Sequence, residues 1–323
     1  MDASVKQRKP WVDAIRALAI IFVVFGHCVP HFQEFFDYTS PIKIPLFFAI
    51  SGYVFNPRVG KTKAFFNNWI KKLVLPYFMI ALIPIIMFSL YYGLDYFTSK
   101  TIALISGDTY WFMPCLIIAE VLLFLIIKFS KRDWQIFLIT ILLFVMGLVL
   151  AYRDQLSFAM INVAFQTPLY MLIGYYFKKY ENVITQMPIW MMIIGVVVYV
   201  ISCLSKTYMF NDTELDLHLS HYYNIPHAIF TIILGCIVIF MVAQRIYYAP
   251  RWLVYIGQNT LVIYLWAGIS YLPFIALSKF GFGLPGNEIL SGIIKTLWAV
   301  ITCGIASHII NKYFPFLLGR KHK

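Results

Sequence analysis

The chain has 323 residues, of which 61% are apolar and only 12% are charged, and its formal net charge is +12. A soluble domain carries about 25% charged residues, so this composition excludes a water-soluble globular protein. The apolar residues come in blocks of about 20, long enough to cross a hydrocarbon core of about 30 Å. We therefore expect an all-α integral membrane protein, a bundle of about ten transmembrane helices.

The expected spans follow one another with short connections. In chain order they lie at about residues 11–31, 43–57, 73–94, 109–129, 134–152, 157–177, 188–205, 224–244, 253–278 and 289–311. The second is short for a span. The first is not a cleaved signal peptide, because it contains Asp13 and Arg16 and is followed by further spans. Residues 1–323 are expected to form a single membrane domain without a soluble domain.

The positive charge could suggest a nucleic-acid partner, but its distribution along the chain argues against one. With the N-terminus in the cytoplasm, the expected cytoplasmic segments carry most of the lysines and arginines. The expected outer segments carry only Lys43, Lys100, Arg153, Lys206 and Lys279. This bias is the positive-inside rule, and it predicts that both chain ends are cytoplasmic. The basic charge then favours anionic lipid or an anionic cytosolic ligand.

The first span carries the densest set of ionisable residues. Arg16 and His27 are eleven residues apart, which on a helix returns to within about 20° of the same face and separates them by about 16 Å along the axis. Asp13 lies one turn before Arg16, and His31 one turn after His27. A structural Asp13–Arg16 pair and a packed histidine would be the simplest explanation. Because charges inside a membrane are costly, the aligned set favours a functional site.

Three further segments have polar residues where lipid contact is expected. Residues 45–55 (PLFFAISGYVF) include Ser51-Gly52, which permits close helix approach or a kink. Glu120 lies in mid-span, where a carboxylate must be protonated or partnered. Residues 257–264 (GQNTLVIY) begin a span with polar side chains that could line a cavity.

A basic segment follows the second span on the cytoplasmic side. It carries Arg58, Lys61, Lys63, Lys71 and Lys72 and is expected to be a loop. It could simply satisfy the positive-inside rule, or it could hold the phosphates of a nucleotide-like ligand. An outer loop between about residues 206 and 224 is rich in acids and histidines; it could meet a sugar or a cation, although solvated side chains are the simpler explanation.

Taken together and in this order, these features resemble the bacterial acyltransferase-3 family, polytopic proteins that acylate surface polysaccharides and related sugars. The resemblance rests on Arg16 and His27 at the family's Arg-x10-His spacing. It is supported by the motif at 45–53, by the basic segment running into Leu-Pro-Tyr at 75–77, by Trp111-Phe112 with Glu120, and by residues 257–264. The chain is similar to the short, stand-alone branch that includes fucose-type O-acetylases and the enterobacterial common antigen O-acetyltransferase.

The resemblance implies an enzyme of the bacterial cytoplasmic (inner) membrane that takes an acyl group, acetyl by default, from cytoplasmic acyl-CoA. The acceptor would be a hydroxyl of a carbohydrate or lipid-linked glycan, and no metal or nucleic acid is expected. His27 would be the general base or, as an alternative, a transient acyl carrier. Asp13 would orient Arg16, and Glu120 would either orient His27 or bind the acceptor. Substrate contacts are expected from Trp111, Ser51 and Asn259. CoA would be bound by basic residues: Arg16, Arg58, Lys61, Lys63, Lys71 and Lys72.

A transporter or flippase for a glycan or lipid-linked sugar is the alternative. Buried His, Glu and Asp side chains could then form a proton relay. Transporters often show matching halves with broken helices. The charges here concentrate in the first four expected spans and no matching halves are found, which favours an enzyme. A scaffold without chemistry would leave the aligned residues of the first span unexplained.

Overall fold

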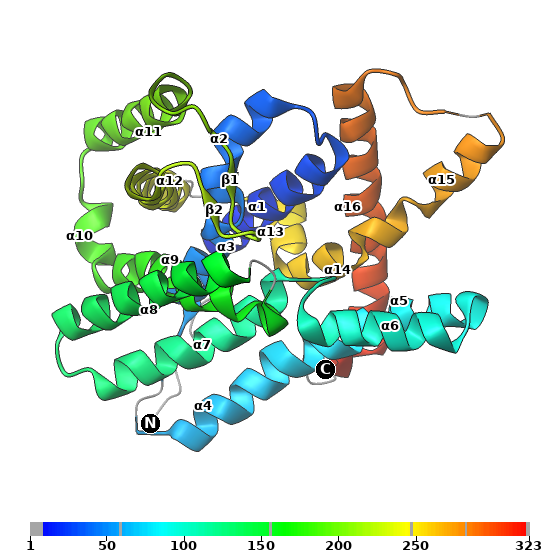
Figure 1. Ribbon diagram of the computed structural model, residues 1–323, viewed down its shortest axis with the longest axis horizontal. Coiled ribbons are helices and arrows are strands. Elements are labelled where there is room, and N and C mark those ends of the chain that lie inside the picture. The colour runs from blue at the N-terminus through cyan, green and yellow to red at the C-terminus, as the bar shows by residue number, and fades with distance from the viewer. Residues whose placement is uncertain (1–8, 58–59, 155–156, 246–247, 282, 321–323) are drawn as a thin grey trace.

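The computed structural model describes residues 9–57, 60–154, 157–245, 248–281 and 283–320 (Figure 1). The described chain is helical apart from one short antiparallel hairpin. Its elements are α1 (Pro10–Cys28), α2 (Gln33–Lys43), α3 (Pro45–Val54), α4 (Thr62–Trp69), η1 (Ile70–Val74), α5 (Leu75–Tyr92), α6 (Leu94–Ser106), α7 (Phe112–Phe129), α8 (Asp133–Arg153), η2 (Phe158–Met160), α9 (Ile161–Lys179), α10 (Glu181–Thr185), α11 (Ile189–Met209), β1 (Leu215–Asp216), β2 (His221–Tyr222), α12 (Ile225–Arg245), α13 (Arg251–Gln258), α14 (Thr260–Ser270), α15 (Leu272–Lys279), α16 (Glu288–Tyr313) and η3 (Pro315–Leu318).

Eight helical segments of the described chain are long and apolar enough to cross a membrane, fewer than the ten or so predicted. The expected span at 43–57 corresponds to α3, whose 10 residues extend only about 15 Å. The expected span at 157–177 corresponds to α9, which buries Asn162, Gln166 and Thr167. Its polar side chains bond to Ser220 and Tyr222 of the hairpin segment, and α3, α7 and α8 also pack against it, so α9 is a core helix.

Two further expectations are corrected by the helix boundaries. The basic segment expected as a loop is helical from Thr62 and continues through the π-helix η1 into α5, so Thr62–Tyr92 forms one segment of 31 residues. The span expected at 253–278 is broken at Asn259 and again at Tyr271. The polar residues predicted to open this span therefore lie at a helix break, where backbone groups and side chains can turn toward a cavity.

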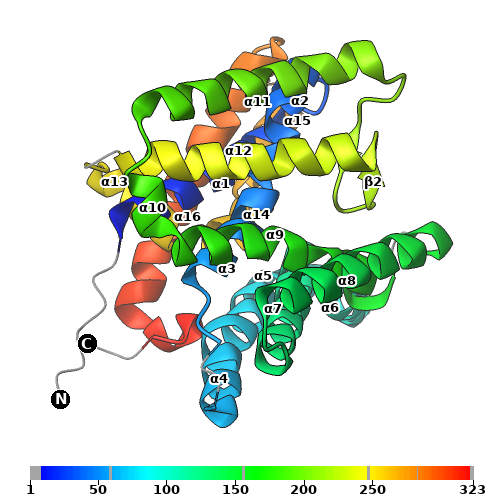
Figure 2. The same cartoon turned by 90° about the vertical axis from the view of Figure 1, so that its left-hand side faces the viewer.

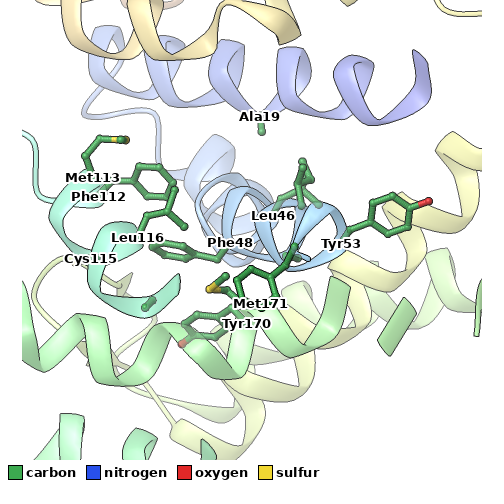
Figure 3. Close-up of a cluster of buried hydrophobic side chains, with 14 of the residues drawn as sticks. Ala19, Leu46, Phe48, Tyr53, Phe112, Met113, Cys115, Leu116, Tyr170 and Met171 are labelled. Atoms are coloured by element: carbon green, nitrogen blue, oxygen red, sulfur yellow. The ribbon is translucent and has the colours of Figure 1, made fainter. Parts of the chain in front are cut away.

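The centre of the bundle is the short helix α3, enclosed by α1, α7 and α9 (Figure 3). A Cβ atom added at Gly52 would lie 1.8 Å from the carbonyl oxygen of Met171, and one added at Gly174 would lie 1.7 Å from that of Ala49. The two helices thus touch backbone to backbone at paired glycines, as membrane helices do at small residues. This confirms the close approach predicted from Ser51-Gly52.

The two ends of the bundle differ in character. Figure 2 shows α11 and α12 side by side, with the β-hairpin at one end and α10 and α13 at the other. At the end opposite the hairpin, the Gln258 side chain donates to Asp13 at the start of α1, and its carbonyl accepts from Arg320 near the chain terminus. The first and last described helices therefore begin and end, respectively, on the same side.

Candidate functional site

Helix α1 lines two cavities along one face. Arg16, Ile20 and Val23 border the first cavity, and Val23, His27 and Pro30 border the second. These positions recur at three- and four-residue steps, the period of one helical face. The alignment predicted for Arg16 and His27 is therefore confirmed, whereas His31 lies beyond the end of α1 at Cys28. We name the cavities the Arg16 chamber and the His27 chamber.

The Arg16 chamber has a volume of about 260 Å³ and combines three charged groups with apolar walls. Helix α7 contributes Phe112, Leu116 and Glu120, again at helical spacing. The Glu120 and Arg16 side chains interact electrostatically. The remaining wall consists of Ile44, Phe47, Ser51, Val54, Lys72, Leu73, Met113, Thr260, Leu261 and Tyr264. Ser51 faces this chamber because its neighbour Gly52 faces α9.

Arg16 is held from behind by a hydrogen-bonded network. Its guanidinium lies 3.6 Å from the Asp13 carboxylate, which is only 1% exposed. The Gln258 Nε2 atom donates to the second Asp13 oxygen at 3.3 Å. Helix α13 can approach α1 this closely because Gly257 has no side chain; an added Cβ atom would lie 1.8 Å from the Asp13 carbonyl oxygen. Asp13 borders neither chamber, so its charge acts on Arg16.

The His27 chamber is larger, about 770 Å³, and opens toward the hairpin end. That volume is typical of sites for small molecules. Its walls come from α1, α2, the start of α7, the end of α11 and the segment leading through the hairpin. The lining residues are Val23, Gly26, His27, Pro30, Gln33, Phe36, Ser40, Lys43, Ile44, Trp111, Lys206 and residues 211–218. The chamber is therefore much more polar than the Arg16 chamber.

Ionic and aromatic contacts hold the outer wall of the His27 chamber. The Lys206 ammonium is 3% exposed, lies 2.9 Å from Asp37 Oδ1 and donates to the Thr213 carbonyl at 3.1 Å. The His218 ring stacks on Trp111 with centroids 5.2 Å apart. Burial lowers the pKa of His218, and the neighbouring Asp216 carboxylate partly opposes this effect. The hairpin segment is thus tied to α2, α7 and α11.

The two chambers adjoin at Val23 and Ile44, which line both. Arg16 and His27 lie on either side of this junction, about 16 Å apart along α1. The His27 side chain is exposed to the chamber, and among the described residues it has no hydrogen-bond partner. An imidazole open in this way can accept a proton from a bound molecule.

Not all of the predicted site residues gather here. Arg16, Ser51, Lys72 and Glu120 border the Arg16 chamber, and His27 and Trp111 border the other. Glu120 is thus placed with Arg16 and not with His27. Lys61 lies just before α4, Lys63 on α4 and Lys71 on η1; all three are exposed and line neither chamber, and Arg58 lies outside the described residues.

Asn259 is also away from both chambers. It is 4% exposed, donates to the Tyr255 carbonyl and accepts from Asn311. These contacts hold the helix break in place, and it is the next residue, Thr260, that borders the Arg16 chamber.

Sequence reasoning missed two lysines of the His27 chamber. Lys43 and Lys206 were assigned to outer segments without a role in the site, but they line the cavity. The sequence did contain a signal: few basic residues lie on the expected outer side, and both lysines lie beside apolar segments. A charge is costly next to lipid, so a lysine there usually has a functional or structural partner.

The comparisons with known proteins identify the family of the chain. The model of the acyltransferase-3 family, described as an acyltransferase domain, matches residues 9–308, which include every element bordering the two chambers. Neither the curated proteins nor the solved structures contain a match. With eight segments of its described residues long and apolar enough to cross a membrane, and a family match over nearly its whole length, the chain belongs to the acyltransferase-3 family of membrane acyltransferases.

Proposed function

We propose that this protein is an O-acyltransferase of the bacterial cytoplasmic membrane that moves an acyl group, acetyl by preference, from cytoplasmic acyl-CoA to a hydroxyl of a cell-surface or lipid-linked sugar. One observation carries the proposal: α1 places Arg16 in one chamber and His27 in the adjoining one. A donor entering from the Arg16 side and an acceptor entering from the hairpin side would meet near the junction at Val23 and Ile44.

The Arg16 chamber suits the extended arm of a CoA thioester. Its volume of about 260 Å³ is below that of most ligand pockets, about 300–1,000 Å³, and its walls are largely apolar. A narrow chain fits such a space, whereas a nucleotide does not. The CoA phosphates would stay at the cytoplasmic mouth, near Arg16 and Lys72, with Lys61, Lys63, Lys71 and Arg58 supplying further positive charge.

The His27 chamber suits the acceptor. Neutral His27 takes the proton of the acceptor hydroxyl while that oxygen attacks the thioester carbonyl carbon. The carbon–sulfur bond breaks, and His27 passes its proton to the leaving thiolate, which departs as CoA-SH. Trp111 offers an aromatic face on which a sugar ring can pack. Asp13 orients Arg16, and Glu120, in the same chamber as Arg16, positions the donor arm together with Ser51.

The test is transfer of radiolabel from acetyl-CoA to the envelope glycan fraction by membranes containing wild-type protein or His27→Ala. Label with the wild type and none with the variant, at equal expression, is the expected result. Equal label with both would overturn the role of His27.

Adjoining chambers also describe a path across the membrane, which keeps the transporter alternative in view. Absence of label with every acyl donor and envelope acceptor fraction, together with His27-dependent movement of a lipid-linked sugar in vesicles, would favour transport over acylation.

A further inference from the structure

Lys43 is the last residue of α2, and its side chain enters the His27 chamber. The ammonium nitrogen lies 4.2 Å from the centroid of the Phe36 ring, which lines the same chamber. Lys43 and His27 interact electrostatically, so the cation lies within reach of the group proposed to be the base.

The Lys43 ammonium differs from the other lysine of this chamber. Lys206 is engaged by Asp37 and by a backbone carbonyl. For Lys43, no ion pair within 4.0 Å and no hydrogen bond is found among the described residues. His27 on α1 and Asp216 on β1 interact with it electrostatically at longer range, and Lys206, Asp212, Glu214 and His218 also line the chamber. Its three N–H donors are therefore available to a molecule bound in the chamber.

Acyl transfer needs such a donor. When the acceptor oxygen attacks the thioester carbonyl, negative charge develops on the carbonyl oxygen, and donors already in place there stabilise the transition state. The Lys43 ammonium lies against the Phe36 ring, which shields one side of it from water and so strengthens such a contact. Lys43 borders the His27 chamber, and the next residue, Ile44, borders both chambers, so the chain that carries Lys43 passes the junction where donor and acceptor would meet.

We propose that Lys43 is a catalytic residue of the His27 chamber, whose ammonium donates a hydrogen bond to the carbonyl oxygen of the acyl thioester as the acceptor attacks. The inference rests on the proposed function. The acceptor proton goes to His27, the new carbon–oxygen bond forms, and the charge on the carbonyl oxygen is held by Lys43. When the carbon–sulfur bond breaks, this charge returns to the carbonyl, and Lys43 keeps its own proton throughout.

The experiment measures initial rates of acetyl transfer for Lys43→Met, Lys43→Gln and Lys43→Arg in membranes, with acetyl-CoA and acceptor each varied. Loss of one such donor lowers kcat by about 10²–10³-fold. We expect that loss for Lys43→Met with little change in either KM, an intermediate loss for Lys43→Gln, and the smallest loss for Lys43→Arg, which keeps the charge. The matched control is Lys100→Met, because Lys100 is an exposed lysine that also lies over an aromatic ring, at 5.9 Å from the Tyr96 centroid.

Two outcomes overturn the proposal. Lys43→Met with a kcat within threefold of wild type would remove Lys43 from the chemistry. A raised KM for the acceptor with unchanged kcat would make it a binding residue for an anionic acceptor. If Lys43→Met fails to reach the membrane, the kcat values of Lys43→Arg and Lys43→Gln are compared instead. Equal kcat values would contradict a role for the positive charge. If the wild type transfers no acyl group, the proposed function fails instead, so the two failures remain distinct.

Discussion

The backbone contact between α3 and α9 makes a sharp prediction for Gly174→Ala. The added Cβ would lie 1.7 Å from the Ala49 carbonyl oxygen, whereas contacts under 3.0 Å are essentially never seen, so the helices must separate by at least 1.3 Å, the difference of the two. Overpacking of this kind costs about 1–3 kcal/mol. Alanine returns about 0.5–1 kcal/mol through its better helix propensity. A net loss of about 1–2 kcal/mol is expected.

The displacement should also reach the chemistry. Helix α3 carries Ser51 into the Arg16 chamber, and a shift of about 1 Å in a catalytic arrangement can lower the rate about 10²-fold. We therefore expect Gly174→Ala to lower both the melting temperature in detergent, by about 2–3 °C, and the acetyl-transfer rate.

Gly268→Ala is the matched control, because Gly268 is also helical and a Cβ there meets nothing within 4 Å. It should melt at or slightly above the wild-type temperature with unchanged activity. If Gly174→Ala matched Gly268→Ala in both measurements, the α3–α9 contact would not be what positions Ser51.

Three further substitutions test other parts of the site. Asp13→Asn removes the negative charge beside Arg16, whose side chain is 25% exposed and so partly screened by solvent. The KM for acetyl-CoA should rise about tenfold, which corresponds to about 1.4 kcal/mol of binding free energy. An unchanged KM would contradict the orienting role of Asp13. Lys206→Met leaves Asp37 without its cation. Because Asp37 is 18% exposed, the loss of stability should be about 2 kcal/mol, less than the 3–5 kcal/mol for breaking a fully buried pair. We expect faster proteolysis of residues 211–218, and resistance equal to that of the wild type would contradict a role of the Lys206–Asp37 pair in holding this segment. Burial lowers the pKa of His218, so its ring is neutral and supports the chamber wall at pH values above 6.5, the ordinary pKa of histidine, and this support is lost as the pH falls through the lowered pKa. With the wild type, the KM for the acceptor should therefore rise between pH 7.5 and 5.5. His218→Phe should flatten this rise, and a pH profile identical to that of the wild type would refute the role.

Much of the architecture was accessible from local sequence patterns. Long apolar blocks with few charges predicted membrane-spanning helices, and the described residues contain eight helical segments long and apolar enough for that role. The spacing of Arg16 and His27 predicted their common face, because helical periodicity depends only on neighbours in sequence. The small residues Ser51-Gly52 predicted either a close helix approach or a kink, and the close approach is present.

Other features required the tertiary structure. Residues 157–177 were predicted as a span, but their place in the core, against α3, α7 and α8 and with the polar side chains bonded to the hairpin segment, appears only in the tertiary structure. Glu120 was assigned to either His27 or the acceptor, and packing placed it beside Arg16. Helical periodicity says which residues share a face but not which helix that face meets.

The sequence by itself thus determined the membrane class, the aligned face of α1 and the resemblance to acyltransferase-3 proteins. Only the tertiary structure decided that this face borders two adjoining chambers, and that Lys43 from α2 and the segment 211–218 complete the second. The physical reason is that a chamber is made by groups distant in sequence. Their meeting depends on backbone contacts such as the one between Gly52 and Met171, which no single segment encodes.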